Sequence, residues 1–600
     1  MKNLHLQLLI LLSPIMVACS TLIAPDGDAT QETAISPEST VSAATESSVV
    51  VEEEPVEYGN FTLEQLEIAL LSELGGMRGY LPQAAEGYYE LALETGDLNI
   101  IRRASEFVSA SGNTEALNQL AKLWTSKDPQ AMEPHLLLGY QLMEEGLYGQ
   151  ALPHLAAVME LGGQVDFTAM SARTYTLENR QRAIIISQLQ DMVTRHPDEP
   201  TLYFAIAQMY DQSSMSEQAA QWLQTGREKF GDSPRTYLIE AQLLQNMGRA
   251  EQAETVLISA VKQYPDHRLL RYSLAQLLVQ NNKLAEAALE FEYIMQREPR
   301  DFETLYSLVL INLELEEYNK AEPRLRELIG AGHRMNEANY YLAIILEDRN
   351  AIDEAINRYQ QINRQSNAYL TAQRQILRLL VQLERFQDAK NWSQQLANSD
   401  ARLAPVMPTL EAEALMNADQ NERARDVLDQ ALSSFPDNID LLFARALLAE
   451  RFDDMALVEQ DLRRIIDLDP QNARALNHLG YAMTLRTDRY QEAIDLISRA
   501  LAVTPDDPAI IDSLGWVQYK LGLLDESIVN LRRAYALFPD HEVAAHLGEV
   551  LWVNGQLDEA IDVWETSLEE FPNSEFIMEA MRRLIPADAD VIQPEQRLSS

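Results

Sequence analysis

The side chains that most often carry chemistry in proteins are few or scattered in this sequence. Nine histidines are spread over 600 residues, and none has the His-Glu-x-x-His spacing that places two metal ligands on one helix face. The closest pair, His541 and His546, spans an expected helix start, so a surface or packing role is favoured over metal binding. Adjacent acids such as Asp506 and Asp507 lie between two prolines, where turn formation accounts for them.

Nucleotide-binding and hydrolase motifs are also missing. The sequence contains no Gly-x-x-x-x-Gly-Lys-Ser/Thr phosphate loop and no Gly-x-Ser-x-Gly nucleophile elbow. We therefore expect no enzyme activity, no cofactor and no metal site.

The single cysteine, Cys19, has an informative position. It excludes an intramolecular disulfide and a cysteine-based metal site. It follows a short basic start at Lys2 and a mostly apolar stretch from Leu4 to Val17, which is too short to span a membrane. Residues 1–18 are therefore predicted to be a signal peptide, and no later segment is long and apolar enough to cross a membrane.

The residues Met16-Val17-Ala18-Cys19 resemble the lipobox of bacterial lipoproteins. In that family the cysteine is lipidated and becomes the mature N-terminus. Met16 departs from the more usual leucine, and a plain signal peptide with an incidental cysteine is the alternative. With Ser20 rather than aspartate after the cysteine, the resemblance implies an outer-membrane protein that faces the periplasm and is attached through its N-terminal lipid only.

The composition changes after Cys19. Up to about residue 57 the chain is rich in Ser, Thr, Ala, Glu and Pro, and such a segment buries too little apolar surface to fold. Residues 19–57 are therefore predicted to be a disordered tether with a reach on the order of 35 Å.

The chain is strongly acidic, with 92 acidic against 48 basic residues and a net charge of −44. Solvated helix faces account for most of this charge. It steers basic partners toward the surface and makes nucleic acid a poor ligand, because phosphate binding needs clustered Lys and Arg.

Prolines recur with a period near 34 residues. Pro265 and Pro299 are 34 apart, and the later members follow at intervals of 34, 35, 34 and 33: Pro436, Pro470, Pro505, Pro539 and Pro572. A fixed period of this length is the mark of a helix-turn-helix solenoid.

The residue types inside each period fit that unit. A small residue lets the first helix approach the second, an alanine lies at their crossing, and proline ends the second helix. These positions include Leu138, Gly139, Ala151 and Leu155; Ala253, Leu257 and Ala260; Leu514, Gly515 and Ala534; and Leu547, Gly548, Ala560 and Trp564. They resemble the tetratricopeptide repeat.

The resemblance implies an all-α solenoid, a right-handed superhelix of helix-turn-helix units. It covers residues 58–573 with about fifteen units, and residues 574–600 are expected to form a capping helix and a C-terminal tail. The pattern is weaker where Gly231, His333 or Asn367 replaces the proline, and over residues 405–470. Only about 27 residues follow the last unit, so we expect surface for binding and no separate catalytic domain.

A stripe of large side chains recurs every 34 residues. In five successive units the fifth position of the first helix, which faces the groove in this family, holds Phe204, Leu238, Tyr272, Tyr306 and Tyr340. Such a stripe could grip an extended peptide, and packing between repeats is the alternative.

Nearer the C-terminus the corresponding stripe is more polar. It holds Asn477, Tyr481, Asp512, Trp516 and Glu549. Trp516 is of a type that anchors interfaces, although a core role is as plausible. No unit pairs lysine at its fifth position with asparagine at its ninth, which disfavours the carboxylate clamp of chaperone-binding relatives.

The segments 477–481, 508–516 and 545–552 resemble the C-terminal repeats of large repeat lipoproteins of Gram-negative bacteria. This group includes the lipoprotein partner of a periplasmic carboxyl-terminal processing protease, which brings the protease to substrates such as peptidoglycan hydrolases. The resemblance implies a protease adaptor. A scaffold for envelope assembly, in exopolysaccharide export or in pilus or secretion machinery, is the alternative.

Overall fold

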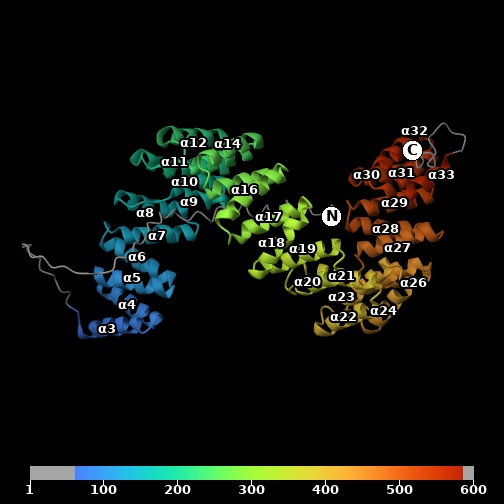
Figure 1. The fold of residues 1–600 in the computed structure, drawn as a ribbon, viewed down its shortest axis with the longest axis horizontal. Coiled ribbons are helices and arrows are strands. Elements are labelled where there is room, and N and C mark those ends of the chain that lie inside the picture. Colours follow the sequence, from blue (N-terminus) through green and yellow to red (C-terminus); the bar gives the residue numbers. More distant parts are fainter. Residues whose placement is uncertain (1–60, 586–600) are drawn as a thin grey trace, which may run out of the picture. The chain divides into compact units, whose positions relative to one another are not determined.

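The computed structural model describes residues 61–585 (Figure 1). The predicted signal peptide, Cys19, the predicted tether and residues 586–600 of the predicted tail lie outside this range. Helices are the regular elements throughout the described residues, so the predicted all-α repeat fold is confirmed. Within residues 61–585 every helix is too short or too polar to span a bilayer.

The chain divides into two compact units between Arg324 and Leu325, inside α18. The helices up to that point are α3 (Leu63–Met77), α4 (Leu81–Thr95), α5 (Leu98–Ser111), α6 (Thr114–Lys127), α7 (Met132–Glu144), α8 (Tyr148–Glu160), α9 (Phe167–Ala172), the 3₁₀ helix η1 (Thr174–Thr176), α10 (Asn179–Arg195), α11 (Pro200–Gln212), α12 (Ser216–Phe230), α13 (Pro234–Asn246), α14 (Ala250–Gln263), α15 (Arg268–Gln280), α16 (Leu284–Arg297), α17 (Phe302–Glu314) and α18 (Tyr318–Gly330).

The second unit continues the same pattern. Its helices are α19 (Met335–Asp348), α20 (Ile352–Gln360), α21 (Tyr369–Gln382), α22 (Phe386–Ser399), α23 (Val406–Asn417), α24 (Asn421–Ser434), α25 (Ile439–Arg451), α26 (Met455–Leu468), α27 (Ala473–Arg486), α28 (Tyr490–Val503), α29 (Pro508–Lys520), α30 (Leu524–Leu537), α31 (His541–Val553), α32 (Leu557–Glu570) and α33 (Glu575–Leu584).

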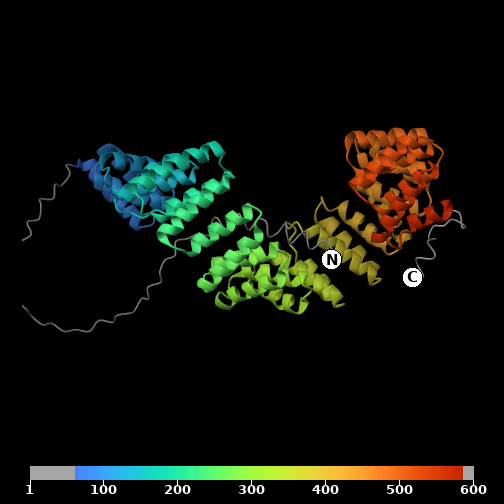
Figure 2. The ribbon, with the colours of Figure 1, turned by 90° about the horizontal axis from the view of Figure 1, so that it is seen from above.

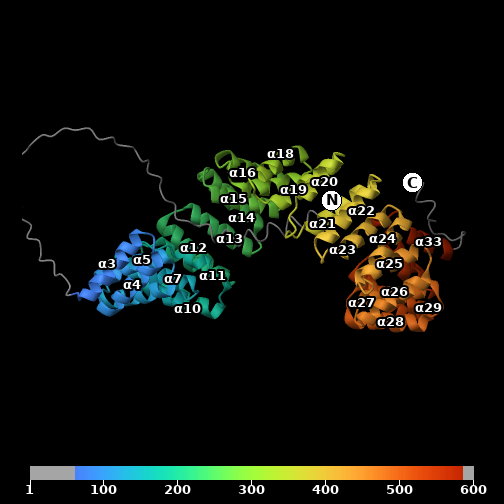
Figure 3. The same ribbon diagram turned by 90° about the horizontal axis from the view of Figure 1, so that it is seen from below.

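Consecutive helices pair within each unit, and each pair stacks on the next (Figures 2 and 3). A first helix packs on its own second helix and on the next first helix, as α27 does on α28 and α29. The predicted small residues lie where two helices cross. A Cβ on Gly515 would lie 2.6 Å from Leu531, and one on Gly548 would lie 2.2 Å from the indole nitrogen of Trp564, so only glycine allows this approach.

Short polar side chains begin many of the first helices. Asp507 accepts hydrogen bonds from the backbone N–H groups of Ala509 and Ile510 at the start of α29, and Asn472 accepts one from Ala475 at the start of α27. Such caps satisfy backbone donors that a helix end leaves open. Asp507 thus has the turn role that its position predicts.

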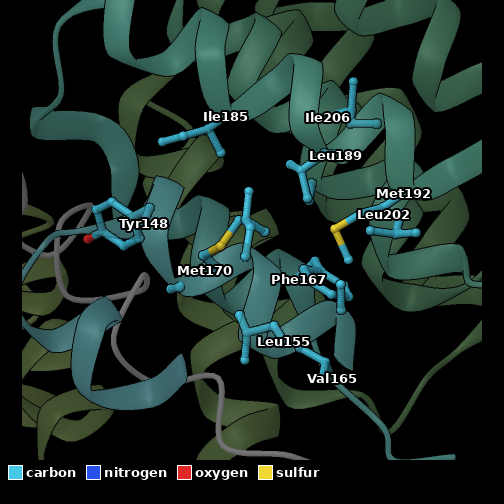
Figure 4. Close-up of a cluster of buried hydrophobic side chains, with 14 of the residues drawn as sticks. Tyr148, Leu155, Val165, Phe167, Met170, Ile185, Leu189, Met192, Leu202 and Ile206 are labelled. Atoms are coloured by element: carbon cyan, nitrogen blue, oxygen red, sulfur yellow. The ribbon is translucent and has the colours of Figure 1, made fainter. Parts of the chain in front are cut away.

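One pair is irregular. The helix α9 has six residues and passes into η1, although the period gives no sign of a break. The Thr174 hydroxyl donates to the carbonyl of Ser171, at 2.7 Å, and such side-chain bonds compete with helix continuation. The short helix is held by burial, because Phe167 and Met170 are fully enclosed in an apolar cluster that also contains Leu189 (Figure 4).

Candidate protein-binding groove

Three adjoining hollows lie along the first helices of the second unit. The first has a volume of about 860 Å³ and is lined from α21, α23, α25 and α27. The second, of about 530 Å³, involves α25, α27 and α29, and the third, of about 420 Å³, involves α27, α29 and α31. The first two share Phe443, Leu447 and Arg474, and the last two share Asn477 and Ala509. The three hollows therefore form one continuous groove.

We call the first of these the arginine hollow, after Arg374, Arg451 and Arg474. The Arg374 side chain forms an ion pair with Glu413 at 3.3 Å. Arg474 is exposed, and its guanidinium carbon lies 3.6 Å from the centre of the Phe443 ring. No carboxylate in the described part of the chain forms an ion pair with Arg474. Its planar donors, held by the ring below them, are therefore available to an incoming carboxylate.

We call the third the acidic hollow, because its charged lining residues are Asp512, Asp540 and Glu542. Its apolar walls come from Pro508, Ala509, Phe538 and Val543. Neither lysine nor arginine lines it, so it differs in charge from the arginine hollow.

The acids of this hollow are held by defined partners. The Tyr481 hydroxyl donates to Glu542 at 2.8 Å, and Asp540 accepts from the backbone N–H of Glu542, capping α31. Burial, followed by the charge of Glu542, raises the pKa of Tyr481. The phenol therefore stays protonated and keeps Glu542 in place as an acceptor.

Behind the acidic hollow lies a buried acid–imidazole pair. Nδ1 of His546 is 3.0 and 3.1 Å from the two carboxylate oxygens of Asp512, and the Trp516 ring stacks on the imidazole with 4.0 Å between centroids. Burial alone would lower the pKa of His546. The charge and hydrogen bond of Asp512, with nearby Glu542 and Glu549, outweigh burial and raise this pKa.

The acidic hollow offers acceptors to a ligand. Its acids are described above, the Ser513 hydroxyl donates to the carbonyl of Ala509, and the Asn477 side-chain oxygen is buried without a hydrogen-bond partner among the described residues. A group that fits must donate hydrogen bonds and carry an apolar stem, since buried acceptors without donors are costly.

The polar stripe predicted from the sequence lies partly on this groove. Asn477, Tyr481 and Asp512 line the acidic hollow. Trp516 and Glu549 are buried, with 6% and 4% of their surface exposed, and Glu549 pairs with Arg583. These two residues therefore support the hollow from behind.

The earlier stripe is largely enclosed by its own repeats. Phe204, Tyr272 and Tyr306 are 4%, 7% and 4% exposed, whereas Leu238 and Tyr340 are half-buried. The Tyr272 ring meets Phe291 edge-on at 5.5 Å, and Tyr340 meets Tyr359 in the same manner at 5.7 Å. This burial favours the packing alternative for the three enclosed residues, and peptide binding by the stripe stays a prediction.

Sequence reasoning missed Phe443 and Arg474, which join two of the hollows. A signal was present, because Phe443 stands 27 residues before Pro470, the same offset that Tyr272 has from Pro299. It was missed because the repeat pattern over residues 405–470 is weak. Arg474 has no comparable mark in the sequence.

No chemistry beyond binding stands out in the described range. Residues 61–585 contain no group of three or more His, Cys, Asp or Glu side chains that could hold a metal ion. Of the two histidines noted in the sequence, His541 contacts the Ser574 hydroxyl at 2.9 Å, and His546 is paired with Asp512. A repeat fold of this kind provides surface for protein partners.

Comparison with known proteins agrees with the repeat architecture. The tetratricopeptide repeat family matches residues 240–301, 306–367, 409–457, 459–508 and 513–575. The TPR repeat-containing protein PA4667 of Pseudomonas aeruginosa is 30% identical over 504 residues, which cover 84% of this chain and 85% of the relative.

Solved structures with a similar fold include two large repeat assemblies. The Cut9–Hcn1 hetero-tetramer of the APC/C matches 88% of this chain and 97% of its own at 14% identity and a TM-score of 0.29. The Naa15/Naa10 complex bound to HypK-THB matches 90% of this chain and 86% of its own at 13% identity and a TM-score of 0.31. These likenesses are too weak to indicate a function. The repeat pattern, the helix pairs and the long match to the Pseudomonas protein together show that the chain belongs to the tetratricopeptide repeat proteins.

Proposed function

We propose that the groove of the second unit holds an extended segment of a partner protein, and that the chain acts as a scaffold by binding rather than by catalysis. The observation that carries this proposal is the continuity of the three hollows, which share residues at each junction. An extended peptide suits such a groove, because its side chains can enter successive hollows while its backbone follows the helices.

The two ends of the groove favour different side chains. At the arginine hollow, Arg474 offers a guanidinium that is stacked on Phe443 and free of carboxylates in the described chain. At the acidic hollow, acceptors stand between apolar walls, which suits the long stem and cationic head of lysine or arginine. We therefore expect a partner segment that carries an acidic group and, further along, a basic side chain.

The cellular role that we propose is that of an adaptor anchored to the outer membrane. It would bring a periplasmic carboxyl-terminal processing protease to substrates such as peptidoglycan hydrolases. Support comes from the sequence: the lipobox-like residues before Cys19, and the segments 477–481, 508–516 and 545–552 that resemble repeat lipoproteins of this kind. Two of these segments also supply the lining of the acidic hollow.

The groove can be blocked at one exposed position. Ala509 lies where the second and third hollows meet, and its side chain is exposed. We expect Ala509→Arg to fill the junction and weaken binding of the protease or its substrates by about tenfold or more, with the melting temperature unchanged. The matched control is Ala536→Arg, the same change at an exposed position of the second helix α30.

The measurement is affinity of the purified chain for the candidate protease and for a peptidoglycan hydrolase, together with recovery of both from envelope extracts. If Ala509→Arg and Ala536→Arg bind equally well, the groove is not the binding site. If neither protein binds the unaltered chain, the adaptor role is wrong, and the proteins recovered from the extract identify the alternative.

The membrane anchor is tested separately. We expect Cys19→Ala to move the protein from the membrane fraction to the soluble fraction, because lipidation of this cysteine is the attachment that we propose. Firm retention of the variant in the membrane fraction would contradict the proposal.

A further inference from the structure

The first helix of the described chain, α3, presents an unusual apolar face. Its large apolar side chains are exposed over much of their surface: Leu63 by 84%, Leu66 by 49%, Leu70 by 54%, Leu71 by 63%, Leu74 by 45% and Met77 by 78%. At 100° per residue these side chains fall on one side of the helix. The opposite side carries Ser72, the one residue of α3 that is buried.

This end of the array differs from the other end. The C-terminal helix α33 buries Ile577, Met578, Ala580 and Met581 against the last pair and turns charged residues outward. Terminal repeats need such a polar outer face for solubility. Because α3 lacks one, its stripe needs a cover, and contiguous exposed apolar surface of this kind marks an interaction site.

The charges beside the stripe indicate what covers it. Glu64 and Glu67 stand at the N-terminal end of α3 and Arg78 directly follows its C-terminal end, all three exposed and on the same flank of the stripe. When two copies of α3 lie antiparallel, the acidic end of one meets Arg78 of the other. A two-fold interface must be self-complementary in this way, and the stripe supplies leucines at coiled-coil-like spacing at 63, 66 and 70.

We propose that two copies of this chain associate through an antiparallel pairing of their α3 helices. The apolar stripes then cover one another, and the flanking charges fix the direction. The scaffold becomes two-headed, since each copy keeps its own groove.

The test is sedimentation equilibrium of the full chain carrying Cys19→Ala, so that acylation does not drive association. We expect a dimer at micromolar concentrations. Leu70→Glu should weaken it by about tenfold or more, because it places a charge in the apolar seam. The matched control is Leu289→Glu on α16, where the leucine is 66% exposed and outside the stripe, and this variant should dimerise normally.

Charge reversal tests the direction. Glu64→Arg and Arg78→Glu should each weaken the dimer, and the two together in one chain should restore it, because the reversed ends again face opposite charges. A chain that is monomeric at tens of micromolar overturns the proposal, as it would if residues 1–60 or another protein covered α3. A dimer that withstands Leu70→Glu, or a double reversal without rescue, overturns it equally.

Discussion

Replacing Tyr272 by alanine should destabilise the first unit without weakening partner binding in the groove. The ring is 7% exposed, meets Phe291 edge-on at 5.5 Å and lies 5.7 Å from the Arg268 guanidinium. A tyrosine side chain buries roughly 150 Å² or more, which at about 25 cal/mol per Å² corresponds to about 4 kcal/mol. This agrees with the roughly 3–5 kcal/mol that aromatic-to-alanine changes cost in cores. Leu238→Ala, at the equivalent but half-buried position, should cost about 1–2 kcal/mol.

The assay combines urea unfolding, followed by circular dichroism, with amide hydrogen exchange in α15 and α16. Exchange locates the loss, because stability in a repeat array is distributed over neighbouring units. Affinity for the partner is measured on the same protein. Unchanged stability together with a large loss of affinity would refute the packing interpretation and show that the Tyr272 ring contacts a ligand.

The remaining predictions concern the helix crossing and the buried histidine. Gly548→Ala should cost about 1–3 kcal/mol in urea unfolding, because the new Cβ would lie 2.2 Å from the rigid Trp564 indole; Gly149→Ala, whose nearest contact would be 3.6 Å away, should cost nothing. Asp512 raises the pKa of His546 in the folded state, so the pair stabilises the fold fully below the unfolded pKa of about 6.5 and loses this effect as pH rises through the folded pKa. Asp512→Asn should therefore lower stability more at pH 6 than at pH 9 and lower the His546 midpoint in an NMR titration; an equal loss at both pH values would contradict this assignment.

The fold could be predicted because its period is visible in single residues. Gly515 and Gly548 lie at crossings where a Cβ would collide with Leu531 or Trp564, so the small residue and the large one recur together. The irregular pair at α9 was invisible, because its break depends on a local hydroxyl bond and not on the period. Phe167 and Met170 still occupy core positions there, so apolar content alone could not distinguish the short helix from a regular one.

The candidate site could be predicted only in part, because equivalent repeat positions differ in exposure. The fifth position places Tyr272 against Phe291 in the core, whereas Phe443 at the same offset is buried yet borders two hollows. What decides between these outcomes is the neighbouring first helix and the size of its side chains. That information belongs to the stacked pair and not to the single repeat.

The charge of the groove shows why overall composition misleads at such a site. A net charge of −44 suggests a surface that attracts only basic partners. The arginine hollow nevertheless collects Arg374 from α21, Arg451 from α25 and Arg474 from α27, three residues that are far apart in the sequence and adjacent only through stacking. Because stacking also places the acidic hollow next along the same groove, the two charges are ordered along one line, and this order gives a bound segment its direction.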